Sequence, residues 1–192
     1  MTTIVAINGY LAADQNHASY QNLPRYVAQK MHASEHNSIM GAIYGDSTSL
    51  AELYQMSTLL EIYMHRCRTK DEELKEKCAE AADMLKKIVG HNDFLAIQKC
   101  GEDILTIHVA DGGVDLPWRE DGIAFGTGCF IAKAMYHIQK QNDEFDIREI
   151  MGHCIAIDPQ TGGGYTVCNG ETLFDARDLT DDDIRKAIEK AM

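Results

Sequence analysis

The first residues that could do chemistry stand at the start of the chain, where two threonines follow the initiator methionine in MTTIVAI. Removal of Met1, which a small second residue favours, would leave Thr2 with a free α-amine beside its own hydroxyl. A threonine hydroxyl is a weak nucleophile until a base accepts its proton, and an N-terminal amine can act as that base. The reference pKa of such an amine is about 7.7 to 8.0, so part of it is unprotonated near neutral pH. Thr2 is therefore a candidate nucleophile for acyl transfer.

Further short motifs carry residues suited to supporting such a nucleophile. They are AAD at 12–14, the lysine at position 30, GAIYG at 41–45, FGTG at 125–128 and DPQTGGG at 158–164. Each is weak alone, because glycine-rich segments with a hydroxyl residue are most often turns. The opening threonines also have a purely structural explanation, since β-branched residues are common in strands.

Together with TTIV at 2–5, these motifs arrive in the order and approximate spacing seen in β-type proteasome subunits and the bacterial HslV peptidase. The chain therefore resembles an N-terminal nucleophile hydrolase. The resemblance implies that Thr2 is the nucleophile, that Asp14 orients a catalytic lysine, and that Lys30 is this lysine. Arg25 is the second candidate for this cationic role, after Lys30.

The same resemblance assigns roles to the glycine-rich motifs. It implies that the Gly45 N–H stabilises the oxyanion, and that Thr127, Asp158 and Thr161 hold the amine and a water network. Three departures from the family pattern are visible: Asp46 follows Gly45 where a second glycine is usual, and threonine replaces serine at 127 and at 161. A hydroxyl is retained at both of these positions.

Local sequence patterns predict the strands and helices that carry these residues. Strands are predicted around an Asn-Gly turn within 3–13, then at 26–32, 38–44, 93–100, 104–111, 123–128, 165–170 and 171–175. Helices are predicted from a Ser47, Thr48 or Ser49 cap over 50–63, from Asp71 to Gly90, and over 130–141, 146–156 and 180–192. Blocks of strands separated by helix pairs indicate an α+β fold of antiparallel sheets with helices outside. The family resemblance implies a four-layer αββα sandwich of two sheets, each flanked by a helix pair.

The totals restrict the class of protein. A length of 192 residues predicts one domain over 1–192, and the net charge of -12 argues against binding to nucleic acid or anionic membranes. No apolar run reaches the ~20 residues of a membrane helix. The six cysteines show no CxxC pair and no secretory signal precedes them, which favours reduced thiols and a cytoplasmic location. No cofactor is expected, and the spacing of His17, His32 and His36 fits no metal site.

The expected function is that of a threonine endopeptidase acting on unfolded protein or peptides. The resemblance is to β-type subunits, because the helical extension that precedes the first strand in α-type subunits is missing here. It implies a self-compartmentalising ring of identical subunits, with an unfoldase ATPase as a candidate partner. Two other functions stay open: a catalytically silent ring or scaffold subunit, and an amidase that uses the same nucleophile on a small molecule.

Overall fold

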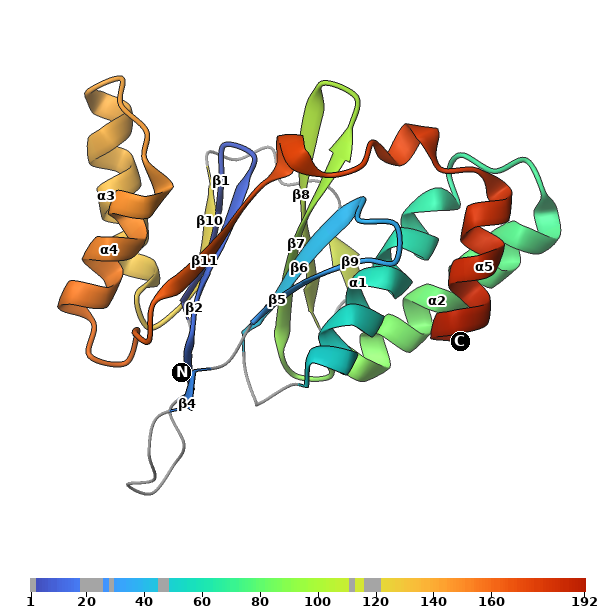
Figure 1. The fold of residues 1–192 in the computed structure, drawn as a ribbon, viewed down its shortest axis with the longest axis horizontal. Coiled ribbons are helices and arrows are strands. Elements are labelled where there is room, and N and C mark those ends of the chain that lie inside the picture. Colours follow the sequence, from blue (N-terminus) through green and yellow to red (C-terminus); the bar gives the residue numbers. More distant parts are fainter. Residues whose placement is uncertain (1–2, 18–25, 28–29, 45–48, 111–112, 116–121) are drawn as a thin grey trace.

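Two antiparallel sheets form the centre of the molecule (Figure 1). The computed structural model describes residues 3–17, 26–27, 30–44, 49–110, 113–115 and 122–192. The first sheet has the order β10-β1-β2-β11 and consists of β1 (Thr3–Ile7), β2 (Tyr10–Asp14), β10 (Ile123–Gly126) and β11 (Tyr165–Asn169). The second sheet runs in chain order through β5 (Met31–Ala33), β6 (Ile39–Tyr44), β7 (Asp93–Cys100), β8 (Asp103–Ala110) and β9 (Gly113–Asp115). A short separate ladder joins β3 (Asn16–His17) to β4 (Tyr26–Val27).

Helices cover the outer face of each sheet, so that the predicted four-layer α+β sandwich is confirmed. The layer outside the first sheet is the pair α3 (Cys129–Gln141) and α4 (Ile147–Ile157), seen at the left of Figure 1. The layer outside the second sheet contains α1 (Leu50–His65), α2 (Glu72–Val89) and a third helix, α5 (Asp181–Ala191). The segment between β11 and α5 crosses from one side to the other and contains two short 3-10 turns, η1 (Gly170–Thr172) and η2 (Ala176–Asp178).

The alternation of side chains along the strands creates three apolar cores, one at each boundary between layers. In β1, Ile4 and Ala6 belong to the core between the sheets, whereas Val5 and Ile7 pack against α3 and α4. In β7, the residues that alternate with the inter-sheet positions pack against α1, α2 and α5. Both sheets are therefore buried on both faces, which holds the strand ends that carry the candidate site in fixed positions.

Local signals in the sequence account for several element boundaries. The β1–β2 hairpin turns at Asn8 and Gly9, both at positive φ (48° and 77°), as a tight Asn-Gly turn requires. Helix α1 begins at Ser49, whose hydroxyl accepts the Glu52 N–H while the Glu52 carboxylate accepts the Ser49 N–H. Helix α2 begins at an Asp71 cap and ends at Gly90, which has φ 57°.

Two strand predictions are wrong. The single strand expected over 26–32 is divided, because Tyr26–Val27 pairs with β3 whereas Met31–Ala33 pairs with β6 in the second sheet. The strand expected over 171–175 is a 3-10 turn at its start. The Asn169 side-chain oxygen accepts the Glu171 N–H, and the Asn169 backbone carbonyl accepts the Thr172 hydroxyl at 2.7 Å. Local polar contacts thus replace strand pairing.

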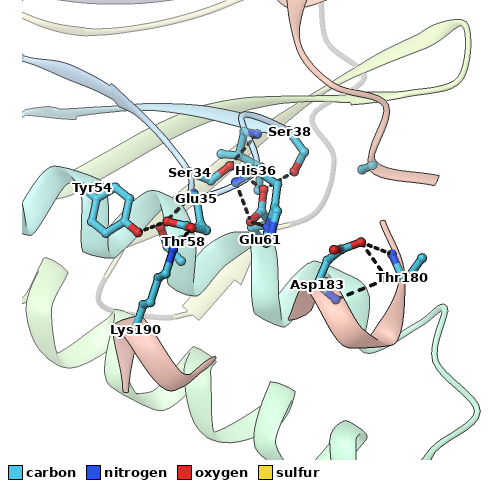
Figure 2. A network of polar contacts seen from close by, with 12 residues as sticks. Ser34, Glu35, His36, Ser38, Tyr54, Thr58, Glu61, Thr180, Asp183 and Lys190 are labelled. Carbon is cyan, nitrogen blue, oxygen red and sulfur yellow. Dashed lines mark hydrogen bonds and ion pairs between the residues drawn. The ribbon is translucent and has the colours of Figure 1, made fainter. Parts of the chain in front are cut away.

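A buried glutamate on α1 fixes the β5–β6 turn (Figure 2). The Glu61 carboxylate is 1% exposed and accepts the hydroxyls of Ser34 and Ser38 at 2.5 and 2.6 Å. It also accepts the His36 ring N–H at 2.9 Å. The neighbouring Glu35 contacts the Tyr54 hydroxyl and the Lys190 ammonium of α5. The turn between β5 and β6 is thus attached to two helices of the outer layer.

Replacing Glu61 by alanine is expected to lower the free energy of unfolding by about 2–4 kcal/mol, because buried hydroxyl and imidazole donors lose their acceptor. Urea denaturation measures this loss. The matched control is Glu73→Ala, which removes a carboxylate that is 79% exposed and paired with Lys77 on the surface of α2. The control is expected to cost less than about 0.5 kcal/mol. Equal losses in the two variants would contradict a special role for Glu61.

Candidate active site

Five short stretches of the chain meet at the end of the first sheet where β1 starts. Strand β1 starts at Thr3, and its ladder with β2 places Thr3 beside the end of β2 at Asp14. On the other side of β1, Thr3 pairs with Gly126, directly before the turn into α3. The remaining contributions come from Lys30, just before β5, and from the turn that follows α4 at Asp158.

Asp14 and Lys30 form a buried ion pair. The Lys30 ammonium lies 2.9 Å from Asp14 Oδ1, and the Asp14 side chain is inaccessible to solvent. The same oxygen accepts the backbone N–H of Thr3 at 2.9 Å, and Oδ2 accepts the Gly162 N–H at 3.3 Å. Burial lowers the pKa of Lys30 below its ordinary value, while the charge and hydrogen bond of Asp14 oppose this shift. The pair therefore holds a poorly hydrated cation next to the start of β1.

Asp158 organises a second cluster from hydroxyls. Its Oδ2 accepts the hydroxyls of Thr127 and Thr161, the latter at 2.6 Å, and its Oδ1 accepts the Gln160 N–H at 3.0 Å. Burial favours the protonated carboxyl, but these hydrogen bonds outweigh it and lower the pKa of Asp158. The carboxylate is therefore ionised at neutral pH and can only accept hydrogen bonds.

Thr3 lies between the two clusters. Its side chain is fully buried, and its hydroxyl lies 2.6 Å from the Thr161 hydroxyl and 2.9 Å from the Gly128 nitrogen that donates to it. A Cβ on residue 128 would lie 2.7 Å from the Thr3 hydroxyl oxygen, so glycine is needed for this approach. Sequence reasoning gave Thr3 only a role in starting a strand. The signal it missed is a second hydroxyl residue directly after the candidate nucleophile.

Comparison with solved structures places this arrangement in a known fold. Eukaryotic HslV from Trypanosoma brucei is similar with a TM-score of 0.56, covering 86% of this chain and 97% of that one at 18% sequence identity. The chain shares the fold of HslV. At this identity the similarity establishes the fold, while the chemistry has to be argued from the residues. No protein-family model and no curated protein sequence matches the chain.

On this HslV-like fold, the structure brings together five of the residues singled out from the sequence: Asp14, Lys30, Thr127, Asp158 and Thr161. Thr2, Gly45 and the rival cation Arg25 lie outside the described residues.

The β5–β6 ladder relates Lys30 to the end of β6. Met31 is the partner of Ala42, so Lys30 and Ile43 are the next positions along this ladder. Tyr44, which ends β6, directly precedes Gly45. The register therefore places the end of β6 beside the Lys30 end of the site.

A groove extends from this end of the site between the two sheets. It has a volume of about 550 Å³ and is lined by 31–33 and Met40 of the second sheet and by 166–169 of β11. Its lining starts at Met31, the residue that follows Lys30. Among the described residues, β5 and β11 are edge strands of their sheets. A mostly apolar groove between two sheet edges is suited to an extended peptide segment.

Among the described residues, no group of three or more His, Cys, Asp or Glu side chains could hold a metal ion. Among the same residues, no helix combines the length and the apolar character needed to cross a bilayer.

Proposed function

We propose that this protein is a threonine peptidase whose nucleophile is the Thr2 hydroxyl, freed for catalysis when Met1 is removed. The observation that carries the proposal is the hydrogen bond between the Thr3 N–H and Asp14, which also binds the buried Lys30. Only one peptide bond separates Thr3 from Thr2. The proposed site uses this connection to hold the Thr2 hydroxyl and α-amine near the buried cation.

In the proposed reaction, Thr2 Oγ1 attacks the carbonyl carbon of a peptide bond and its proton passes to the Thr2 α-amine. The amine then gives this proton to the leaving nitrogen, so that an ester joins the substrate acyl group to Oγ1. Water hydrolyses the ester with the same amine as base. The positive charge of Lys30 favours the deprotonated hydroxyl and the neutral amine, and so assists both partners.

The remaining residues are proposed to support this chemistry. Gly45 supplies an N–H for the oxyanion, where a side chain would obstruct the substrate. Thr127, Asp158 and Thr161 hold the amine and a water molecule in position. This assignment is supported by the ionised state of Asp158 and by the hydroxyls that converge on it.

We propose peptides and unfolded proteins as substrates, processed inside a ring of identical subunits. The groove beside Lys30 supports an extended substrate. The α3–α4 layer exposes Phe130 by 81% and Ile157 by 62%, which supports burial of this end of the layer against another subunit. An ATPase that unfolds substrates is a candidate partner of such a ring.

Covalent labelling tests the proposal directly. The purified native protein is incubated with a peptide vinyl sulfone, and the adduct is mapped by mass spectrometry. The expected result is a chain that lacks Met1 and carries a single adduct on Thr2. An unlabelled chain that retains Met1 would contradict the proposal and favour a silent scaffold subunit. Labelling at Thr2 of a protein that stays monomeric and cleaves only small amides would favour the amidase.

A further inference from the structure

We propose that Thr3 is a positioning residue, whose hydroxyl and N–H together fix the orientation of the peptide unit that carries Thr2. This inference rests on the proposed function, because it concerns how the nucleophile is held. It assigns different tasks to the two adjacent threonines. Thr2 reacts, and Thr3 joins the Asp14–Lys30 pair to the Asp158 cluster.

The count of hydroxyl hydrogens determines which group donates and which accepts in each hydrogen bond at Thr3. Each hydroxyl carries one hydrogen, and an ionised carboxylate carries none. Thr161 donates its hydrogen to Asp158 Oδ2 at 2.6 Å, so it has none left for Thr3. The 2.6 Å contact between the two threonine hydroxyls is therefore a donation from Thr3 to Thr161. Gly128 donates its N–H to the Thr3 oxygen at 2.9 Å, which completes a chain from Gly128 to Asp158.

The backbone of Thr3 is fixed independently of its side chain. Its N–H donates to Asp14 Oδ1 at 2.9 Å. The N–H of residue 3 and the carbonyl of residue 2 belong to one planar peptide group. With its N–H bonded to Asp14 and its side chain bonded to Thr161, Thr3 has little freedom to rotate. We infer that the planar peptide group it shares with residue 2 is held through these two contacts. Misplacing a nucleophile by even about 1 Å can cost on the order of 10²-fold in rate.

The same bonds exclude Thr3 itself as the nucleophile. Its proton is committed to Thr161, and its oxygen accepts the N–H of Gly128. Its amide nitrogen is already bonded to Asp14 within the start of β1. The close approach of Gly128 shows that the Thr3 hydroxyl lies in a tightly packed position rather than on an open surface.

The decisive comparison is between Thr3→Val and Thr3→Ser. Valine keeps the shape and the N–H but removes the hydroxyl, whereas serine keeps the hydroxyl. Thr3→Val is expected to lower kcat by roughly 10- to 100-fold while KM changes less than about twofold, because substrate contacts are unaffected and alignment is lost. Thr3→Ser is expected to stay within about threefold of the unchanged protein in kcat. Thermal unfolding of each variant accompanies the kinetics.

A second variant keeps the test decisive if Thr3→Val does not fold. Thr161→Val interrupts the same series of hydrogen bonds on the Asp158 side and is expected to lower kcat to a similar degree. When both single variants fold, the double variant is expected to lose no more activity than the less active of the two single variants, since both changes break one connection. Multiplicative losses would overturn the proposal, as would a Thr3→Val protein with unchanged kcat and normal labelling at Thr2. Absence of Thr2 labelling in the unchanged protein would overturn the proposed function itself, and this inference with it.

Discussion

Replacing Thr2 by alanine is expected to lower peptide hydrolysis by at least about 10⁴-fold, the scale seen when the nucleophile of a covalent hydrolase is removed. Alanine keeps the α-amine but supplies no oxygen to attack the substrate carbonyl. Thr2→Ser keeps the oxygen and is expected to retain most of the activity. Hydrolysis of a fluorogenic peptide, measured with each purified variant, gives the comparison.

Folding and assembly serve as controls for this experiment. Both variants are required to unfold at the temperature of the unchanged protein and to elute at the same size, so that a loss of activity reports on the Thr2 hydroxyl alone. A Thr2→Ala protein that still cleaves the peptide at a hundredth of the normal rate would show that another group is the nucleophile. That outcome would refute the proposed function.

Removing the charge of Lys30 is expected to have the second-largest effect. Lys30→Met keeps the apolar stem and is expected to lower kcat/KM by about 10²- to 10⁴-fold, because the hydroxyl and amine of Thr2 lose the nearby positive charge. The substitution leaves the Asp14 carboxylate buried and without its cation, which destabilises the fold. The double variant Lys30→Met with Asp14→Asn removes both charges. It is expected to recover stability without recovering activity.

The pH dependence follows from the same pair. Burial lowers the pKa of Lys30, so this ammonium loses its proton at a lower pH than an exposed lysine does. Activity should therefore fall on the alkaline side before the pH reaches the ordinary lysine value of 10.5. A pH–rate profile checks this direction. Activity of Lys30→Met equal to that of the unchanged protein would exclude the cation from the mechanism.

Local signals explain why much of the fold was predictable from the sequence. The Asn-Gly turn, the caps at Ser49 and Asp71 and the stop at Gly90 each act over a few residues, and each forms as expected. The strand prediction for 171–175 was wrong because the polar side chain of Asn169 binds the Glu171 N–H, in competition with the β-like composition of the segment. Local patterns predict helices and strands well, but they do not include the hydrogen bonds that nearby side chains form with the backbone.

The candidate site was predictable only in part, because its contacts depend on long-range packing. The resemblance pointed to Asp14 and Lys30, which lie in contact. Nothing in the sequence indicated that the Thr3 hydroxyl meets Thr161, and Glu61 reads as an ordinary polar residue of an amphipathic helix although it is buried. Gly41 is similar. A strand was predicted over 38–44, but the packing of this glycine was not: in β6 it leaves room for Phe94, whose ring atom Cζ would lie 2.1 Å from a Cβ there.

The place of β1 in its sheet also determines when during synthesis the site can form. This strand lies between β2 and β10, and Thr3 contacts a residue 158 positions later. A ribosome adds about 5–20 residues per second, so the first threonines emerge on the order of ten seconds before their last partner does. Nascent chains would therefore be inert toward one another and toward other newly made polypeptides. On the proposed function, the capacity to cut would arise only after the turn that follows α4 has been synthesised.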